Sequence, residues 1–363
     1  MSIFKKENEK GSAVANQVHR SSIESSASLL HKEGVMQRKL SERETGPVSV
    51  NAGHFSDLYI TPDKTSYVWS GKSNSGLRVA DYIDLQEFIK AVVEKFDGEN
   101  PSYSLHYKGF NYRVERTVAL EGEQYCARKM PQSIPELEKL GLPSGVYRQV
   151  LTLADKSGLI LLAGATGSGK STTISSLIKR YLETEGGYAF TIEDPIEMPL
   201  DGVYKTKNGD LGLCKQTVPP KGVWEEGIKS ALRSKPRYIY LGEIRSPEAA
   251  VEVLRAATSG HMVLSTIHSN NVNDAINAMV KYAASSGISE DMAYELMANG
   301  LLACIHQNLQ GSPRRLEVEA IFANPNINSG CVVRSMIRTG SLNIATIMEQ
   351  QQTKMEKGLP LFD

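Results

Sequence analysis

A glycine-rich stretch near the middle of the chain constrains the fold more than any other feature of the sequence. It matches the pattern G-x-x-x-x-G-K-[ST] and consists of Gly164, Ala165, Thr166, Gly167, Ser168, Gly169, Lys170 and Ser171. An apolar run at residues 159–162 precedes it, and a helix-like segment at residues 172–182 follows it. In this setting, backbone N–H groups and the start of a helix surround phosphate groups. We therefore predict a nucleotide-binding loop, with Thr172 beside it, in which Lys170 contacts the outer phosphates and the Ser171 hydroxyl is a ligand of Mg²⁺.

Length and composition limit the remaining possibilities. A chain of 363 residues is too long for one ordinary core, so two domains and some poorly packed sequence are expected. Lys plus Arg and Asp plus Glu balance at 41 each, which argues against the broad positive field of a protein that binds nucleic acid strongly. No apolar run approaches the roughly 20 residues that cross a bilayer. We therefore predict a cytoplasmic protein without membrane insertion.

Residues 1–50 are polar and mixed in charge. They carry too little apolar surface to offset the entropy of ordering, so we expect a disordered or mobile tail. A weak apolar pattern within the tail fits a transient helix, with a helix that docks on a partner as the alternative. The residues of this pattern are Ile23, Leu29, Leu30, Met36 and Leu40.

Residues 51–130 show the patterns of a small α+β domain. Alternating apolar and polar residues predict strands, whereas apolar residues at intervals of three and four predict one helix. The expected strands are residues 55–60, 65–69, 103–107 and 112–118, and the expected helix is residues 84–96. The buried face of that helix should consist of Leu85, Phe88, Ile89, Val92 and Val93.

Prolines and glycines interrupt residues 131–150, where we expect a linker. Residues 151–363 should then form an α/β domain with a helical C-terminal segment. Its predicted strands are apolar on both faces, as central parallel strands covered by helices are. These strands are residues 159–162, 188–192, 238–241 and 262–266.

Two glutamates follow predicted strands and are candidates for the chemistry of hydrolysis. Glu243 comes just after residues 238–241, in the position of an acid that supports the metal and orients its water. Glu193 follows residues 188–192 and should emerge at the same edge of the sheet. We predict that Glu193 polarises the attacking water, because hydrolysis needs a base or positioning group within hydrogen-bond reach of that water. A solvated loop acid for Glu243 and a structural turn for Glu193 are the alternatives.

Four motifs occur in an order typical of one protein family. They are the phosphate loop, an acidic box at residues 191–197, a glutamate strand at residues 241–245 and a histidine box at residues 258–268. Over residues 55–355 the sequence resembles the secretion and pilus ATPase superfamily, most closely the PilT-like ATPases that retract type IV pili. The resemblance implies a RecA-like P-loop ATPase core with a smaller N-terminal α+β (PAS-like) domain.

The resemblance also implies roles for individual residues. It makes Glu193 the catalytic base, while Glu243 supports the metal and its water. His261 and His268 would sense the state of the nucleotide, although a single histidine beside a strand is more often structural. The implied cofactors are ATP and Mg²⁺.

Members of this family work as hexameric rings in which the nucleotide lies between the N-terminal domain and the core. Arg113 and Arg128 match best the arginines that reach toward the nucleotide, with a solvent-facing or fold-bracing role as the alternative. The resemblance thus implies a homohexamer that acts on an inner-membrane platform protein. Such a ring would lie at the inner face of the cell membrane through its partners.

The sequence departs from the family pattern in places. Gln216 and Thr217 stand where an arginine commonly appears, and Ser246 replaces an acid that often follows the glutamate-strand arginine. Arg233 also matches a family position. Residues 331–340 approximately match a helix associated with retraction in PilT-like proteins.

The predicted function is a hexameric ATPase motor that powers type IV pilus dynamics of the retraction type. Pilus-assembly and type II secretion ATPases usually carry a four-cysteine zinc module, which this chain does not show. The short, zinc-free ATPases of type IV secretion and conjugative transfer systems share its features and are the near alternative. A DNA-translocating motor on the same core is a second alternative, which the balanced charge disfavours. A third is a regulatory paralogue that binds ATP without hydrolysing it, which the presence of Lys170, Glu193 and Glu243 disfavours.

Overall fold

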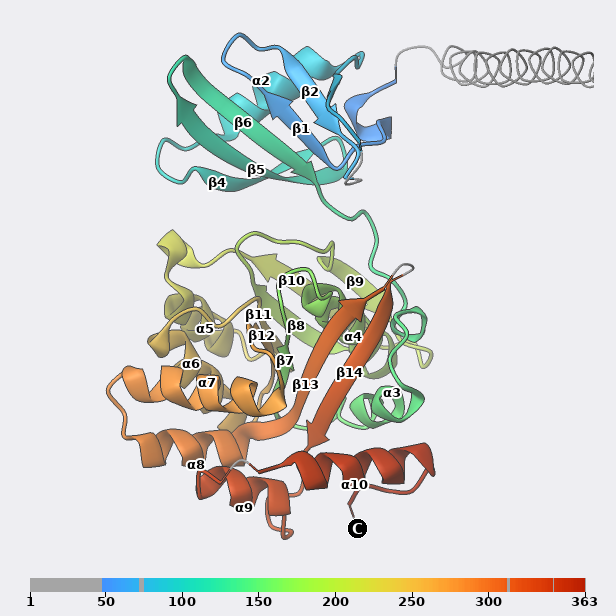
Figure 1. Ribbon diagram of the computed structural model, residues 1–363, viewed down its shortest axis with the longest axis vertical. Helices are drawn as coiled ribbons and strands as arrows, with labels where there is room; N and C mark the ends of the chain where they lie inside the picture. The colour runs from blue at the N-terminus through green and yellow to red at the C-terminus, as the bar shows by residue number, and fades with distance from the viewer. Residues whose placement is uncertain (1–47, 72–74, 312–313, 342, 363) are drawn as a thin grey trace, which may run out of the picture.

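The structure, a computed structural model, describes residues 48–71, 75–311, 314–341 and 343–362. These residues form two units, each built on one β-sheet, and the N-terminal unit lies above the larger one in Figure 1. The predicted tail and its weak apolar pattern lie outside the described residues, apart from residues 48–50.

The N-terminal unit is an antiparallel sheet with strand order β3-β2-β1-β6-β5-β4, covered by one helix. Its elements are η1 (Val50–Ala52), β1 (Asp57–Ile60), β2 (Ser66–Trp69), β3 (Arg78–Val79), α2 (Leu85–Lys95), β4 (Ser102–Tyr107), β5 (Phe110–Ala119) and β6 (Gly122–Lys129). The predicted helix and all four predicted strands of this unit are present. The sequence patterns did not predict β3 or β6.

The helix α2 packs on the sheet through the face that its periodicity indicates. Phe88, Ile89 and Val92 are buried, and Phe88 contacts the rings of Tyr107 and Tyr112 on β4 and β5. Val93, expected on the buried face, is instead 43% exposed, because it lies at the edge of the apolar stripe. The centre of the stripe is therefore buried in the core, and Leu85 packs against that core while only partly buried.

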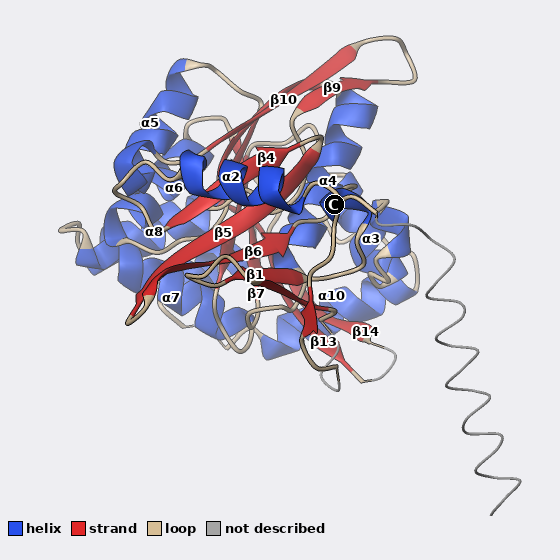
Figure 2. Ribbon diagram, turned by 90° about the horizontal axis from the view of Figure 1, so that it is seen from above, coloured by secondary structure: helices blue, strands red, loops and turns tan. Residues whose placement is uncertain are grey.

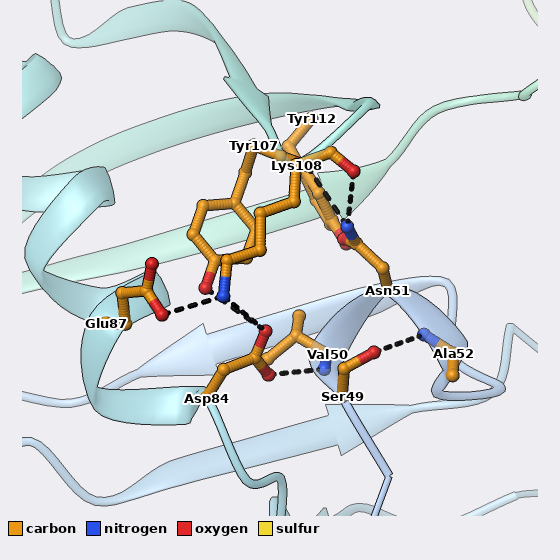
Figure 3. Close-up of polar contacts among 9 residues, drawn as sticks. All are labelled: Ser49, Val50, Asn51, Ala52, Asp84, Glu87, Tyr107, Lys108 and Tyr112. Atoms are coloured by element: carbon orange, nitrogen blue, oxygen red, sulfur yellow. Dashed lines mark hydrogen bonds and ion pairs between the residues drawn. The ribbon is translucent and has the colours of Figure 1, made fainter.

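Hydrogen bonds fix the start of this unit, as Figure 3 shows. The Asp84 carboxylate accepts a bond of 2.7 Å from the backbone N–H of Val50 and lies 3.4 Å from the Lys108 ammonium. The Tyr112 hydroxyl donates to the side-chain oxygen of Asn51 at 2.7 Å. Val50 is fully buried as well, so the first described residues already belong to the packed unit.

The connector between the two units contains more regular structure than its prolines and glycines indicate. It includes η2 (Leu137–Lys139) and α3 (Ser144–Leu151). Leu137, Val146 and Val150 are buried in the hydrophobic core of the larger unit. The second half of the expected linker therefore packs as part of that unit.

The larger unit is an eight-stranded sheet with strand order β14-β13-β7-β12-β11-β8-β10-β9. Its strands are β7 (Gly158–Ala163), β8 (Gly187–Ile192), β9 (Gly202–Lys205), β10 (Leu211–Thr217), β11 (Tyr238–Leu241), β12 (Met262–Ile267), β13 (Leu301–Gln310) and β14 (Arg315–Phe322). The six strands from β13 to β10 are parallel, whereas β14 and β9 are antiparallel edges. All four strands predicted from apolar runs are present and central.

Helices cover both faces of this sheet. They are α4 (Lys170–Glu185), α5 (Trp224–Arg233), α6 (Pro247–Thr258), α7 (Val272–Ser285), α8 (Glu290–Gly300), α9 (Val332–Arg338) and α10 (Ala345–Glu356). Leu159 and Leu161 of β7 face the core under α5 to α9, whereas Ile160 and Leu162 face the core under α3, α4 and α10. This two-sided burial explains why the central strands are largely apolar on both faces.

Ser246 and the segment at residues 331–340 have local structural roles. The Ser246 hydroxyl caps α6 by accepting a bond of 3.2 Å from the N–H of Ala249. Within α9, the buried Arg334 side chain donates to the carbonyls of Ala298 and Asn299 at the end of α8.

In the described part of the chain, no helix is long and apolar enough to span a membrane.

The topology decides where a site can form. The parallel strands β7, β8, β11 and β12 end at the same edge of the sheet, and the loops that follow them meet there. The N-terminal sheet lies over the larger unit, and the view from above in Figure 2 shows α2 and β5 in front of the core elements.

Candidate nucleotide site

A cleft of about 600 Å³ lies between the carboxyl edge of the core sheet and strands β5 and β6 of the N-terminal unit. Its volume falls in the usual range for small-molecule sites. The predicted loop residues that line it are Thr166, Gly167, Gly169, Lys170, Ser171 and Thr172. The remaining residues of the predicted loop, Gly164, Ala165 and Ser168, do not line the cleft.

Two glycines of the loop have backbones that other residues do not adopt without strain. Gly164 has φ of 145°, and a Cβ atom there would lie 2.3 Å from the carbonyl oxygen of Gln307. Gly169 has φ of 88° and directly precedes α4. These positions let the loop turn against β13 and point its N–H groups at the cleft.

Lys170 begins α4 and is only 8% exposed. Its ammonium group donates to the carbonyl oxygens of Gly164 and Ala165, both at 2.9 Å. Burial lowers the pKa of Lys170, and the acidic groups Glu243 and Glu197 partly oppose this. A phosphate in the cleft would supply the compensating negative charge that a buried ammonium lacks here.

The phosphate loop has a support that the motif does not reveal. Gln307 on β13 is fully buried, and its side-chain nitrogen donates to the carbonyl oxygen of Ser168 at 2.7 Å. Sequence reasoning missed this residue. Its role follows only from the pairing of strands, because β13 pairs with β7 and so lies beside the loop that follows β7.

Glu193 follows β8 and is 3% exposed. Its Oε1 atom accepts hydrogen bonds from the Thr191 hydroxyl at 2.6 Å and from the Gln216 side chain at 2.8 Å. Burial raises the pKa of Glu193 to about 7, although these two bonds act in the opposite direction. A carboxyl with a pKa near neutrality is well matched to accept a proton from water. Gln216, at the position where the family pattern has arginine, thus contacts the candidate base rather than the cleft.

Glu243 lies between two basic side chains. Its Oε1 atom is 3.0 Å from Nε2 of His268, and its Oε2 atom accepts a bond of 2.8 Å from Arg245. Arg245 in turn lies over the ring of Trp224. All four side chains line the cleft. Both carboxylate oxygens of Glu243 are engaged, which suits contact with a metal through water better than direct ligation.

The structure places His261 away from the cleft. His261 directly precedes β12, and its Nδ1 atom lies 2.9 Å from the carbonyl oxygen of Pro236. His268 follows the same strand at the other end and lines the cleft. His261 does not line this cleft, and its predicted place among the nucleotide-binding residues stays a prediction. Strand β12 separates the two histidines by its length, about 20 Å at the rise of a strand residue.

Two arginines of the N-terminal unit reach the cleft, as expected. Arg113 on β5 is paired in register with Arg128 on β6. The Arg128 Nε atom donates to the buried Asp57 carboxylate at 2.7 Å, which raises the pKa of Arg128. Within the described residues, the Arg113 side chain makes no hydrogen bond or ion pair. Arg314, which precedes β14, also lines the cleft and was not predicted, whereas Arg233 is exposed at the end of α5 outside it.

The donors in the cleft fit Mg²⁺ as a companion of a phosphate group. Mg²⁺ prefers oxygen ligands and takes most of them from water and phosphates. The cleft offers the Ser171 hydroxyl and the Glu243 carboxylate. Within the described residues, no group of three or more His, Cys, Asp or Glu side chains gathers to hold a metal without such help.

The chain is similar in sequence to proteins of known families. The family model described as "Type II/IV secretion system protein" matches residues 97–357. The chain is 29% identical over 262 residues to the "Twitching motility protein" of Neisseria gonorrhoeae, covering 68% of this chain and 67% of that protein. It is 29% identical over 242 residues to the "Type IV pilus ATPase PilU" of Pseudomonas aeruginosa, covering 65% of this chain but 58% of PilU.

A solved structure shares the fold. The pilus retraction motor PilT with bound ADP superposes with a TM-score of 0.66 at 27% identity, covering 86% of this chain and 91% of that one. The likeness confirms the predicted fold class, an α/β P-loop core with a smaller N-terminal α+β domain.

Proposed function

We propose that this chain, which belongs to the type II/IV secretion system protein family, is an ATPase that drives a pilus or secretion machine. The resemblance inferred from the four motifs is thereby confirmed at the level of the family. Two finer assignments are part of the proposal. Action in type IV pilus retraction follows the names of the type IV pilus ATPase PilU and the pilus retraction motor PilT, and the hexameric state follows the resemblance of the motifs.

The observation that carries the proposal is the union of a phosphate loop and a buried glutamate in one cleft. Lys170 and the N–H groups at the start of α4 face the position of the outer phosphates. Glu193 orients a water molecule and takes its proton, since its carboxyl is held in place and has a pKa near 7. When bound, Mg²⁺ neutralises phosphate charge, and Ser171 and Glu243 are the residues that would hold it and its water.

The second domain turns hydrolysis into motion. Arg113 and Arg128 belong to the N-terminal unit, whereas the phosphate loop and both glutamates belong to the core. Loss of a phosphate would therefore weaken a contact between the two units and allow them to rotate. We propose that six copies form a ring at the inner face of the cell membrane, where these rotations act on a platform protein.

The type IV secretion or conjugation branch remains the second candidate, because the family description includes secretion. A motor that moves DNA is less well supported, since the chain has equal numbers of basic and acidic residues.

Steady-state ATP hydrolysis by the purified chain tests the proposal. The wild-type protein should hydrolyse ATP in a Mg²⁺-dependent way and sediment as six copies. Lys170→Ala should abolish detectable nucleotide binding and hydrolysis, because it removes the cation that faces the phosphates. Absence of hydrolysis by the wild-type ring, or hydrolysis by Lys170→Ala at the wild-type rate, would contradict it.

A further inference from the structure

Gln216, at the end of β10, is a junction between the candidate base and the loop that follows it. Its side-chain nitrogen donates to Glu193 Oε1 at 2.8 Å and to the carbonyl oxygen of Met198 at 2.9 Å. Its side-chain oxygen accepts from the backbone N–H groups of Leu200 at 2.8 Å and Asp201 at 2.9 Å. The amide is thus bonded at both ends.

The partners of Gln216 dictate which end of the amide faces the base. A carboxylate and a carbonyl can only accept, and two backbone N–H groups can only donate. Rotating the amide by half a turn would place donor against donor and acceptor against acceptor in all of these contacts. Gln216 therefore presents an N–H donor to Glu193 by necessity.

The two side-chain bonds to Glu193 hold the same oxygen, and the backbone N–H of Glu197 also bonds the carboxyl group. Thr191 and Gln216 both donate to Oε1, whereas Oε2 carries neither bond. The backbone N–H of Glu193 also bonds β10, through the carbonyl oxygen of Thr217 at 2.9 Å. Strand β10 thus contacts both the main chain and the carboxylate of Glu193, the candidate base.

We propose that Gln216 is a positioning residue for hydrolysis, which holds the Glu193 carboxylate in the orientation that meets the attacking water. This inference rests on the proposed ATPase function. Gln216 is not among the residues that line the cleft, so it acts through Glu193 and not on the nucleotide. Because a misplacement of about 1 Å can cost roughly 10²-fold in rate, a base held by two side-chain bonds depends on both of them.

Gln216→Glu is the sharpest variant, since it keeps the shape of the side chain and an oxygen for Leu200 and Asp201. It replaces the donor that faces Glu193 by a second acceptor, which repels the carboxylate. We expect kcat to fall about 10- to 100-fold, while the affinity for a fluorescent ATP analogue stays within about twofold.

The matched control is Gln351→Glu. Gln351 is likewise an amide bonded at both ends, here to the backbone N–H and carbonyl of Phe322, but it is buried on α10 outside the cleft. This substitution should lower the melting temperature and leave kcat of the folded protein unchanged.

A double-mutant cycle separates positioning from a structural effect. If Gln216 acts through Glu193, then Gln216→Glu should change the residual rate of Glu193→Gln by less than about twofold. An equal loss in both backgrounds, a parallel loss of ATP affinity, or wild-type kcat in Gln216→Glu would overturn the inference while leaving the ATPase proposal intact. Failure of the wild-type chain to hydrolyse ATP would overturn both.

Discussion

The two sheets contribute to one cleft in different ways. Charged groups of the core are buried and bonded to their own domain, as Lys170 is to carbonyl groups of its loop and Glu193 is to Thr191 and Gln216. The arginines of the N-terminal sheet are more open, and the Arg128 side chain is 57% exposed. The core therefore holds its reactive groups in fixed positions, whereas the N-terminal sheet adds more exposed charges to the same cleft.

The family match adds to this contrast. It begins at residue 97 and so includes β4, β5 and β6 but not β1, β2, β3 or α2. The strands that carry Arg113 and Arg128 thus fall within the shared region. The half of the N-terminal sheet without cleft residues falls outside it.

Among substitutions in the N-terminal sheet, Arg113→Ala should lower kcat the most. Within the described residues Arg113 has no ionic partner, so its charge is free to stabilise the phosphate that is transferred. We expect kcat to fall roughly 10²-fold with a much smaller change in ATP affinity. Arg116→Ala is the control, because Arg116 lies on the same strand but is paired with Glu123. Equal hydrolysis rates for the wild type and Arg113→Ala would show that Arg113 takes no part in hydrolysis and that residues of the core suffice.

The pH dependence of kcat/KM should come from the core alone. Glu193 accepts a proton only when ionised, so lowering the pH through its pKa of about 7 should remove activity, by about tenfold per pH unit below that value. Arginine side chains stay charged throughout this range. A rate that is flat between pH 5 and 8, at constant nucleotide affinity, would show that the base is another group.

Arg128→Ala should have the smallest effect of these changes. The Arg128 side chain is already paired with the buried Asp57 carboxylate, so that part of its charge is neutralised within the N-terminal sheet. We expect kcat to fall only about threefold, as measured beside Arg113→Ala under the same conditions. A fall in kcat as large as that of Arg113→Ala would show that both arginines contact the transferred phosphate.

The sequence predicts the core better than its surroundings, for a physical reason. Strands covered on both faces are largely apolar, so β7, β8, β11 and β12 stand out in the sequence. Strand β6 buries only alternate residues, among them Tyr125 and Ala127, and its pattern is too weak to detect.

The site shows the same limit. The phosphate loop and Glu193 follow strands that the sequence reveals, whereas Gln307 and Gln216 reach them from β13 and β10 through pairing that only the fold determines. Conversely, His261 and His268 are close in sequence, yet β12 carries them to opposite ends of the sheet. Local patterns predict which residues follow a strand, but not which residues from other strands support them.

Hydrolysis and ATP binding by Glu193→Gln test the central claim most directly. The substitution keeps an oxygen for the bonds from Thr191 and Gln216 and removes only the ability to take a proton. We predict that kcat falls by about 10²- to 10⁴-fold, while ATP affinity stays within about threefold of the wild type. Hydrolysis close to the wild-type rate would contradict the assignment of Glu193 as the base, and with it the account of a core that holds its reactive groups in fixed positions.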